Sequence, residues 1–525
     1  MAQTVTSPPI DAPGARAFEP DALEGRRFFG HPRGLATLFF TEMWERFSYY
    51  GMRAILVLFM TTATLEGGLG FTKADAAIVY GLYTSLVYLL PIAGGWLADN
   101  FLGMRRAILY GGMVIMLGHI LLTFHGPATF YGGLACVVVG TGLLKPNISA
   151  VVGQLYSPQD RRRDSGFSIF YMGINLGAFS APLVCGFLAQ SPTFRGWLSG
   201  WGIDPTHAWH WGFGAAAVGM FFGLLQYVGT GRYLGAAGVV PGGAATPEAR
   251  ARAKRTLLVA SAAIVLLLGG IVAWALSKSE PVTKADINSI YTFVLFGAVS
   301  AFFVWLLSSS AWGKQERRRL IVLLVLFLGS CVFWSVFEQA GNTLTFFADE
   351  RTRNSIFGLR IESSWWQAVN AGLIVAFAPA FAWLWMKLGD FDRSSMIRFS
   401  IGIAFVGISF LVLAGGAARS EGDNLASPMW LFTVYTCHTF GELCLSPIGL
   451  SSMTKFAPQR VQGMMLGIWF ASISVGTFLG SQVAAKYEQF SLEKLVTLVA
   501  LGALAVAVIM AVLARPVGKL VEEKP

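Results

Sequence analysis

Several charged side chains stand together in an apolar stretch near the start of the chain. The stretch covers about residues 35–63, which is long enough to span a lipid bilayer as a helix. Its polar members, which fall on one broad helical face at about 100° per residue, are Glu42, Glu45, Arg46, Tyr49, Tyr50 and Arg53. Ionisable groups at this depth are costly unless they are paired or face water. Such a face is typical of an ion or substrate pathway, although a structural salt bridge between helices gives the same pattern.

Three further charged residues lie deep in apolar stretches. Lys145 belongs to the first half of the chain, as do the two arginines, whereas Glu338 and Glu442 belong to the second half. A site between the halves would therefore carry cations on one side and carboxylates on the other. This dipolar arrangement fits a zwitterion whose carboxylate and ammonium groups are a few bonds apart. Asparagines in the same spans suit a peptide backbone, and the many aromatic residues suit tolerant side-chain pockets.

The composition is that of a polytopic membrane protein. Hydrophobic residues make up 54% of the chain, charged residues make up 13%, and the mean hydropathy is +0.58. The net charge of +10 does not indicate nucleic-acid binding, because the basic residues sit in short loops between apolar spans. The five cysteines fall in apolar spans without disulfide or zinc-ligand spacing, so we expect neither a metal site nor a cofactor. The polar N-terminal tail lacks the pattern of a cleavable signal peptide.

About fourteen apolar spans follow one another along the chain. We predict them at residues 35–63, 74–98, 106–124, 128–153, 165–189, 208–230, 256–277, 286–310, 319–347, 363–386, 395–416, 427–453, 462–484 and 491–514. An even number places both termini on one side of the membrane. The excess of Lys and Arg in the loops of that side makes it cytoplasmic. We therefore expect a multi-pass protein of the inner cell membrane with both termini in the cytoplasm.

The spans divide as six, two and six. The segment 231–257 is rich in Gly, Pro and Ala and then becomes basic, so we interpret it as a cytoplasmic linker. The two spans after it carry no deep charge and look like a helical hairpin between two bundles. The predicted units are an N-terminal tail at 1–32, a six-helix bundle at 33–230, a linker with a two-helix insertion at 231–316, a second six-helix bundle at 317–515 and a C-terminal tail at 516–525.

The pattern Glu-x-x-Glu-Arg-Phe-x-Tyr-Tyr-Gly, from Glu42 to Gly51, resembles the first-helix signature of the proton-dependent oligopeptide transporter family. That family belongs to the major facilitator superfamily. Segments 170–177, 333–339 and 440–447 resemble later motifs of the family in the expected order, and the resemblance covers nearly the whole chain. It implies an all-α polytopic membrane protein with the major facilitator fold, in which two six-helix bundles enclose a site near the midplane.

A second signature stands at the end of the second span, in the segment 94–106. Its small residues let helices approach closely. We expect Asp99 to cap a helix or to pair with loop cations such as Arg105 and Arg106, and thereby to help latch the inner gate. The segment resembles the superfamily's signature for the loop between the second and third helices. It is specific for the family and says little about the substrate.

The resemblance also implies roles for individual residues. Glu42 and Glu45, beside Arg46, are the expected proton carriers, while Arg53 and Lys145 would hold the C-terminal carboxylate of a peptide. The residues expected to hold the amino end are Asn175, Asn370 and Glu442. The remaining residues expected to line the site are Tyr49, Tyr50, Tyr88, Trp334, Glu338 and Trp469.

Three features concern proton coupling and the movement of the halves. A bond from Lys145 or Arg53 to Glu338 could be exchanged when substrate and proton bind, which would bias a rocking equilibrium. Animal members carry a functional histidine in the second helix, but Gly81 stands there in this chain, so that role cannot be carried over. We interpret His438, one turn before Glu442, as a satisfied polar residue near the site.

We therefore expect a proton-coupled symporter that imports di- and tripeptides by alternating access and works as a monomer in the lipid bilayer. The alternative is a proton-coupled carrier of another small anion or peptide-like solute, such as nitrate or an amino acid, on the same fold. A membrane enzyme is disfavoured because the sequence has no metal-ligand cluster, no His-Glu-x-x-His and no convincing nucleophile arrangement. A sensor that has lost transport is disfavoured by the complete set of Glu42, Glu45 and Arg46.

Overall fold

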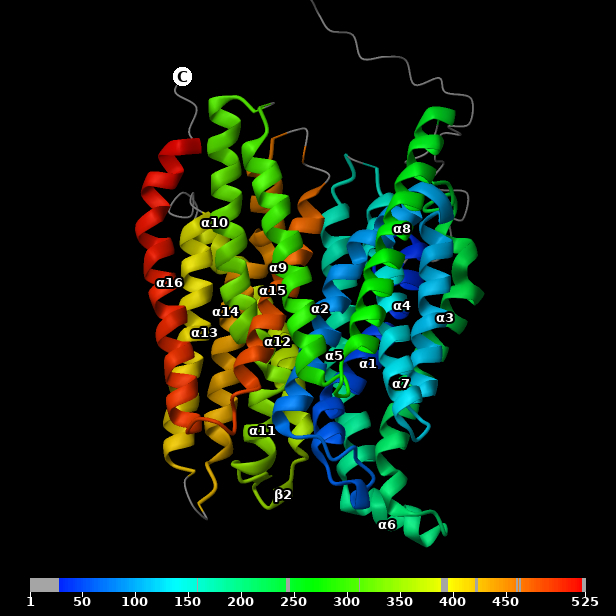
Figure 1. Ribbon diagram of the computed structural model, residues 1–525, viewed down its shortest axis with the longest axis vertical. Helices are drawn as coiled ribbons and strands as arrows, with labels where there is room; N and C mark the ends of the chain where they lie inside the picture. The colour runs from blue at the N-terminus through cyan, green and yellow to red at the C-terminus, as the bar shows by residue number, and fades with distance from the viewer. Residues whose placement is uncertain are drawn as a thin grey trace, which may run out of the picture.

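Nearly all of the described chain is helical (Figure 1). The computed structural model describes residues 28–157, 159–241, 246–310, 312–388, 395–420, 424–458, 461 and 464–521. Within these residues, fourteen helices have 18 residues or more, which is the number of spans predicted.

The long helices fall into three groups. The first six are α1 (Arg33–Thr61), α2 (Lys73–Leu97), α3 (Met104–Leu121), α4 (Pro127–Gln154), α5 (Arg163–Gln190) and α7 (Ala208–Thr230). The next two are α8 (Pro247–Ser277) and α9 (Lys284–Ser308). The last six are α10 (Lys314–Phe337), α12 (Trp366–Leu388), α13 (Ser395–Ala418), α14 (Pro428–Phe456), α15 (Met465–Ala484) and α16 (Leu492–Val521).

Twelve helical segments in the described chain are long and apolar enough to cross a membrane by length and composition. The two long helices outside this group are α1 and α14. Helix α1 carries four charged side chains between Glu42 and Arg53, and α14 carries Glu442 among several Thr and Ser residues. The charged residues that set these two helices apart are therefore members of the predicted site.

Local signals explain several helix boundaries. The Thr72 side chain accepts a hydrogen bond from the backbone N–H of Asp75 and so caps the start of α2. Thr283 and Asp286 form a reciprocal capping box at the start of α9. At its other end, α2 continues into one turn of π-helix, η2 (Ala98–Leu102), and the chain then turns at Gly103 with a φ of 76° before α3 begins.

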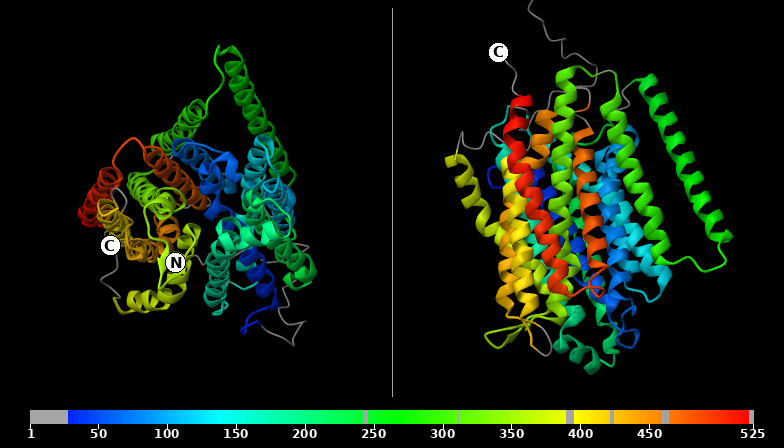
Figure 2. Two further views of the ribbon diagram at one scale, coloured as in Figure 1. Left: turned by 90° about the horizontal axis from the view of Figure 1, so that it is seen from below. Right: turned by 60° about the vertical axis from the view of Figure 1, so that its left-hand side comes forward.

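Two six-helix bundles lie side by side (Figure 1). In the first bundle α1 packs on α5 and α7, and in the second α13 packs on α14 and α16. The bundles meet where α2 packs along α15 and where α5 packs along α12. Helix α9 lies against α2, α10 and α15, whereas α8 stands apart and has only Ala253 buried (Figure 2).

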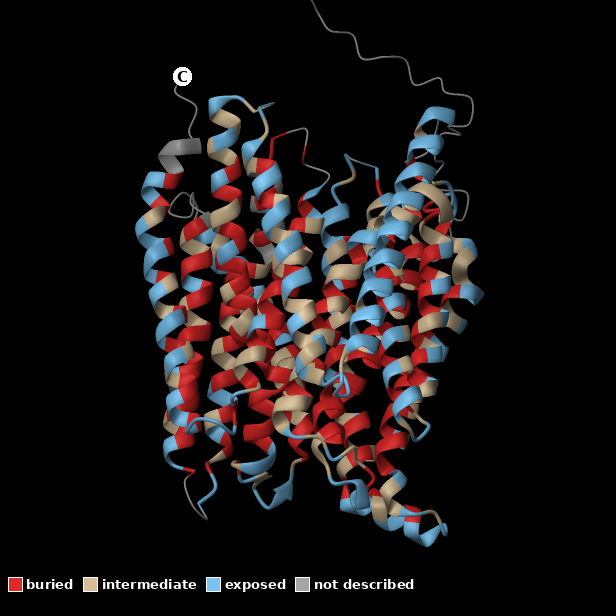
Figure 3. Cartoon of the chain, viewed as in Figure 1, coloured by how far each residue is buried: buried red, intermediate tan, exposed pale blue. Residues whose placement is uncertain are grey.

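Both ends of the described chain lie at one face of the bundles, which we call the terminal face; it holds Phe28 and the last turns of α16 (Figure 1). The opposite, distal face holds the short helices η1 (Thr64–Glu66) and α6 (Pro192–Gly200) and the hairpin of β1 (Ser355–Ile356) and β2 (Leu359–Arg360). Buried side chains follow the inward faces of the helices, and the outward faces are exposed (Figure 3). Large apolar side chains on those outward faces suit contact with lipid.

Two predicted boundaries are wrong. The span predicted at 319–347 is broken: α10 ends at Phe337, a 3₁₀ turn η5 (Glu338–Gly341) follows, and α11 (Thr343–Glu350) completes the crossing. Gly341 and Asn342 are poor helix formers, which accounts for the break. The basic run at 250–255, predicted as part of the linker, already belongs to α8, because Thr246 caps that helix at the backbone N–H of Ala249.

Candidate functional site

Two carboxylates share one guanidinium on α1. Arg46 Nε lies 3.1 Å from Glu42 Oε1 and also contacts Glu45 Oε2, and all three side chains are buried. The second oxygen of each carboxylate and Arg46 Nη2 have no hydrogen-bond partner in the described structure. With both carboxylates ionised, this cluster carries one more negative charge than it can neutralise. Binding of one proton would make it neutral, which is the favoured state at membrane depth.

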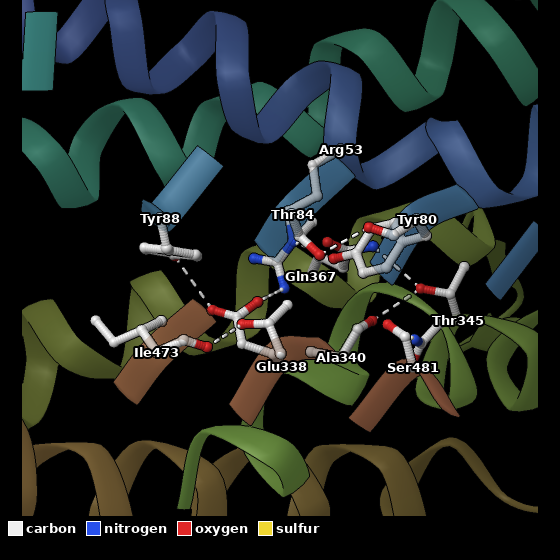
Figure 4. A network of polar contacts seen from close by, with 12 residues as sticks. Arg53, Tyr80, Thr84, Tyr88, Glu338, Ala340, Thr345, Gln367, Ile473 and Ser481 are labelled. Atoms are coloured by element: carbon white, nitrogen blue, oxygen red, sulfur yellow. Dashed lines mark hydrogen bonds and ion pairs between the residues drawn. The ribbon is translucent and has the colours of Figure 1, made fainter. Parts of the chain in front are cut away.

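An ion pair joins the two bundles at mid-depth (Figure 4). Arg53 Nη2 on α1 lies 2.8 Å from Glu338 Oε2, at the break between α10 and η5. Arg53 Nε donates to the Tyr80 hydroxyl at 2.7 Å, and the Tyr88 hydroxyl donates to Glu338 Oε1 at 3.3 Å. Both charged side chains are buried. Gly341 makes room for this arrangement, because a Cβ there would collide with the Tyr80 hydroxyl.

Of the two bonds expected between the halves, the structure forms the one from Arg53. Lys145 makes no ion pair with a described residue, and its Nζ lies 4.2 Å from the centre of the Tyr88 ring and 5.8 Å from that of Phe470. Pairing of Lys145 with Glu338 does not occur in this structure, because Arg53 and Tyr88 already occupy the two oxygens of that carboxylate. Lys145 is only half-buried. Because it forms no ion pair, its ammonium group lacks an anionic partner among the described residues.

The carboxylate of Glu442 lies on the second bundle and is half-buried. Asn370 Nδ2 on α12 donates to Glu442 Oε2 and to Thr439 Oγ1, both at 3.1 Å. The amide thus holds the carboxylate without neutralising it. Asn175, which was expected to work beside these residues, is buried on α5 and donates to the backbone carbonyl of Tyr171 at 3.0 Å.

Aromatic side chains surround these charges. The ring centres of Trp334 and Trp469 are 6.3 Å apart, and both rings are mostly buried. Arg53 lies 5.7 Å from the centre of the Tyr50 ring, and Arg46 lies 5.4 Å from that of Tyr49. Neither the Tyr49 hydroxyl nor the Trp334 indole nitrogen has a hydrogen-bond partner in the described structure. Both polar groups are therefore buried without a hydrogen-bond partner in this state of the described structure.

Further contacts between the bundles lie on the distal side of this site. Lys73 Nζ on α2 is 2.6 Å from Glu350 Oε1 on α11. At the end of α5, Gln190 Nε2 donates to Ser363 Oγ at 2.8 Å, and Gln190 Oε1 accepts from the backbone N–H of Ser364 at 3.2 Å. Together with the Arg53 pair, these bonds close the distal side of the interface between the bundles.

The signature between α2 and α3 is arranged differently from the prediction. Arg105 donates to the backbone carbonyls of Ala237 at 2.7 Å and Gly235 at 2.6 Å, so it binds the linker after α7. Asp99 lies in η2 and is exposed, and it pairs with no cation in the described chain. Arg106 is also exposed. The predicted pairing of Asp99 with loop cations is therefore absent from the described residues, because the linker's carbonyls take the guanidinium of Arg105.

The interpretation of His438 as a satisfied polar residue is wrong. Its ring is buried, and neither ring nitrogen has a hydrogen-bond partner in the described part of the chain. The imidazole lies between the rings of Phe337 and Phe410, with ring centres 5.4 Å and 6.1 Å away. The ring therefore packs as an aromatic side chain.

Sequence reasoning missed several residues of the interface between the bundles. Tyr80 was not assigned to the site although it binds Arg53, and Gln190 and Lys73 were not singled out. Tyr80 precedes Tyr88 by two helical turns and so lies on the same face of the span, which could have indicated its place in the site. The absent histidine is also explained: Gly81 packs directly against Ser481 of α15, so a larger side chain would not fit there.

No group of three or more His, Cys, Asp or Glu side chains within the described residues could hold a metal ion.

A family model described as the POT family matches residues 105–499. The chain belongs to the POT family. It is therefore an integral membrane transporter, not an enzyme, and the family is proton-coupled.

Known relatives span nearly the whole chain. The peptide transporter YePEPT of Yersinia enterocolitica is 38% identical, with 93% of this chain and 94% of that protein covered. The di-/tripeptide transporter of Lactococcus lactis subsp. cremoris is 36% identical, with 94% and 97% covered. A crystal structure of a mutant peptide transporter POT in complex with alafosfalin is 39% identical with a TM-score of 0.85, and 95% of this chain and 97% of that chain are covered. The expected major facilitator fold with two bundles and an insertion is thereby confirmed.

Proposed function

We propose that this POT-family member is a proton-coupled symporter that imports di- and tripeptides by alternating access. The observation that carries the proposal is the charge distribution of the site. The first bundle supplies Arg46, Arg53 and Lys145 together with two carboxylates that share Arg46, and the second bundle supplies only the carboxylates of Glu338 and Glu442. Three cations face four carboxylates, so one proton makes the site neutral. A zwitterionic peptide then adds no net charge.

The peptide would lie between the two unpaired groups of opposite sign. Lys145 has no anionic partner among the described residues and would bind the C-terminal carboxylate, with Arg53 nearby on α1. Glu442 is oriented by Asn370 and would bind the N-terminal ammonium. Tyr50, Tyr88, Trp334 and Trp469 would form walls that tolerate different side chains. Asn175 is engaged with its own helix, so its part would be to shape the wall of the first bundle.

Protons would be carried by Glu42 and Glu45. Each carboxylate has one oxygen on Arg46 and one oxygen without a partner, so either can accept the proton that neutralises the cluster. Protonation of one carboxylate weakens its hold on the guanidinium. Arg46 then shifts toward the remaining carboxylate, which changes the charge that faces Lys145 and the peptide.

Alternating access would use the bonds on the distal side. We place the terminal face, with both termini, in the cytoplasm and the distal face outside the inner membrane. The Arg53–Glu338 pair then closes the outer side in the state described here. A peptide carboxylate competing for Arg53 weakens this pair and biases the equilibrium toward the outward-open state.

The direct test is uptake of labelled dialanine into proteoliposomes, with and without an inward proton gradient. We expect accumulation only with the gradient, and counterflow exchange without it. Uptake of nitrate or a free amino acid in preference to dialanine would contradict the proposal and favour a carrier of another small anion or peptide-like solute. The dipolar site argues for the zwitterion, because a simple anion would leave Glu442 unpaired.

We further propose that the transporter works as a monomer, with units bounded at 1–32, 33–230, 231–316, 317–515 and 516–525. The two bundles of a single chain supply the charged residues of the proposed site, which supports this proposal. Light scattering of the detergent-solubilised protein should give the mass of one chain. A stable larger assembly that loses transport on dissociation would overturn this proposal.

A further inference from the structure

The face of α9 that meets the interface between the bundles carries polar side chains at helical spacing. Lys284, Asn288 and Tyr291 stand at positions i, i+4 and i+7, which place them on one face, and Leu295 continues that face as a buried residue. Polar side chains on an otherwise apolar membrane helix require partners. The companion helix α8 is exposed over almost its whole length, so these partners come from the bundles.

The first bundle provides two of the partners. Lys284 Nζ lies 2.9 Å from Asp75 Oδ2, at the distal end of α2. Two turns further along α9, the Tyr291 hydroxyl lies 2.8 Å from Ser85 Oγ, also on α2. The contacts of α9 with the first bundle therefore run along the distal half of α2.

The second bundle provides the others, at the same depth. Ser85 Oγ also lies 2.7 Å from Ser474 Oγ of α15, so Tyr291 completes a chain of three hydroxyls that crosses the interface. Asn288 and Gln482 of α15 exchange two amide hydrogen bonds, each 2.9 Å long. Tyr291 also packs against Phe478 of α15, with ring centres 5.2 Å apart. The same face of α9 thus binds both bundles.

Toward the terminal face the relation changes. Beyond Leu295, a cavity of about 570 Å³ separates α9 from the interface, and its walls include Val299 and Phe302 of α9, Ile92 of α2 and Phe470 of α15. The cavity is lined mainly by apolar side chains, with Asp99 of η2 as its charged member, and no side-chain hydrogen bond joins α9 to α2 or α15 across it in the described chain. Helix α9 therefore makes polar contacts with both bundles over its distal half, whereas toward the terminal face its Phe303 packs against Phe327 of α10, with ring centres 4.9 Å apart.

We propose that α9 is a strap that holds α2 against α15 at the distal face, with Tyr291 and Asn288 as positioning residues for the transport cycle. Outward opening must separate α2 from α15 and so break the Ser85–Ser474 contact. With the strap in place, outward opening must also break the hydrogen bonds of the Tyr291 hydroxyl and of the Asn288–Gln482 amide pair. It therefore biases the transporter toward the distally closed state, and this inference rests on the proposed function only in requiring that the distal face opens.

The test measures the distance between spin labels at Leu65 of η1 and Leu359 of β2, which are both exposed, on opposite bundles and at the distal face. The labels are attached through unnatural amino acids, which leaves the native cysteines in place. Tyr291→Phe should raise the ratio of distally open to closed molecules by about two- to tenfold, the effect of one net hydrogen bond. The matched control is Ser289→Ala on the exposed side of α9, whose hydroxyl binds only Ala285 of its own helix. It should leave the distribution unchanged.

The amide pair supplies an independent variant set. Asn288→Ala and Gln482→Ala should each shift the distribution in the same direction, and the double variant should shift it no further than either single change, because the two residues share one interaction. If Tyr291→Phe fails to fold, this set carries the test. Distributions that match Ser289→Ala for all of these variants would overturn the proposal. The distances are measured without peptide, so the strap can be tested even if dialanine proves not to be a substrate.

Discussion

We propose that proton coupling depends most directly on Glu45, which is fully buried and shares Arg46 with Glu42. We expect Glu45→Gln to abolish gradient-driven accumulation of dialanine while it retains peptide counterflow, since exchange requires the peptide site but no net proton release. With one proton per peptide, an inward gradient of one pH unit supports about tenfold accumulation in the wild type. Tracer uptake in proteoliposomes measures both modes. Full accumulation by the variant would remove Glu45 from this role.

The amino end of the peptide should depend on the half-buried carboxylate of Glu442, which Asn370 orients at 3.1 Å. N-acetylated dialanine has no ammonium group and leaves this carboxylate unpaired. We expect it to compete with labelled dialanine at least about tenfold more weakly than free dialanine does, since an ion pair with hydrogen bonds is worth about 1.5–3 kcal/mol. Competition assays with matched concentrations provide the measurement. Equal competition by free and N-acetylated dialanine would show that the site does not recognise the ammonium group of the peptide.

At this scale the sequence identified the charged residues but not their pairing. Charges in apolar stretches are conspicuous, so Glu42, Arg53 and Glu338 could be selected directly. Which cation meets Glu338 depends on the relative rotation of helices in different bundles, and no local pattern encodes it. Lys145 and Arg53 were equally suitable from the sequence, and the structure pairs Arg53.

Among the elements, we propose that the contact of α1 with the break after α10 controls opening of the distal face. Glu338→Gln should shift the molecule toward the distally open state, because it leaves the buried Arg53 without its counter-ion, a loss of about 3–5 kcal/mol in comparable pairs. The charge-swapped pair Arg53→Glu with Glu338→Arg should close the face better than either single change. The Leu65–Leu359 label pair measures the populations. Lys73→Gln, which removes a partly exposed pair, should shift them far less.

The start of α1 offers a pH-dependent contact at the terminal face. Burial and the nearby Arg162 guanidinium lower the pKa of His31 from its ordinary 6.5, while Asp160 opposes them. The ring binds the Tyr156 hydroxyl at 3.0 Å, and burial raises the pKa of that hydroxyl to about 12. The folded state binds the His31 proton less readily than the unfolded state does. The contribution of neutral His31 to the free energy of unfolding is therefore fully present above pH 6.5 and is lost as the pH falls below it.

His31→Gln should therefore lose less thermal stability than the wild type between pH 7.5 and pH 5.5. Thermal unfolding of both proteins in the same detergent at the two pH values measures the difference. Equal losses in the two proteins would show that His31 does not contribute to the pH dependence.

Element boundaries followed from local signals only in part. Hydropathy predicted all fourteen long helices, because a spanning helix needs a long apolar run. It missed the break at Glu338, since apolar residues continue through α11 and conceal the poor helix formers Gly341 and Asn342. It also placed the start of α8 too late, because basic residues resemble a loop although they continue the helix to its cap at Thr246.

For the whole molecule, the order of motifs and the six-two-six division predicted the fold, whereas the state of the transporter could not be predicted. Closure at the distal face results from many contacts between distant segments, such as Gln190 with Ser363 and Ser85 with Ser474. The role of the two-helix insertion was also hidden, since its apolar pattern is that of any membrane hairpin. Only the three-dimensional contacts of α9 connect it with the interface between the bundles.

We propose that one proton neutralises the site of three cations and four carboxylates and is carried with each zwitterionic peptide. The most direct measurement is proton flux into proteoliposomes that contain a pH-sensitive dye, driven only by an inward gradient of unlabelled dialanine. We predict that the lumen acidifies in step with peptide uptake in the wild type and does not acidify with Glu45→Gln. Peptide uptake by the wild type without acidification would contradict the account.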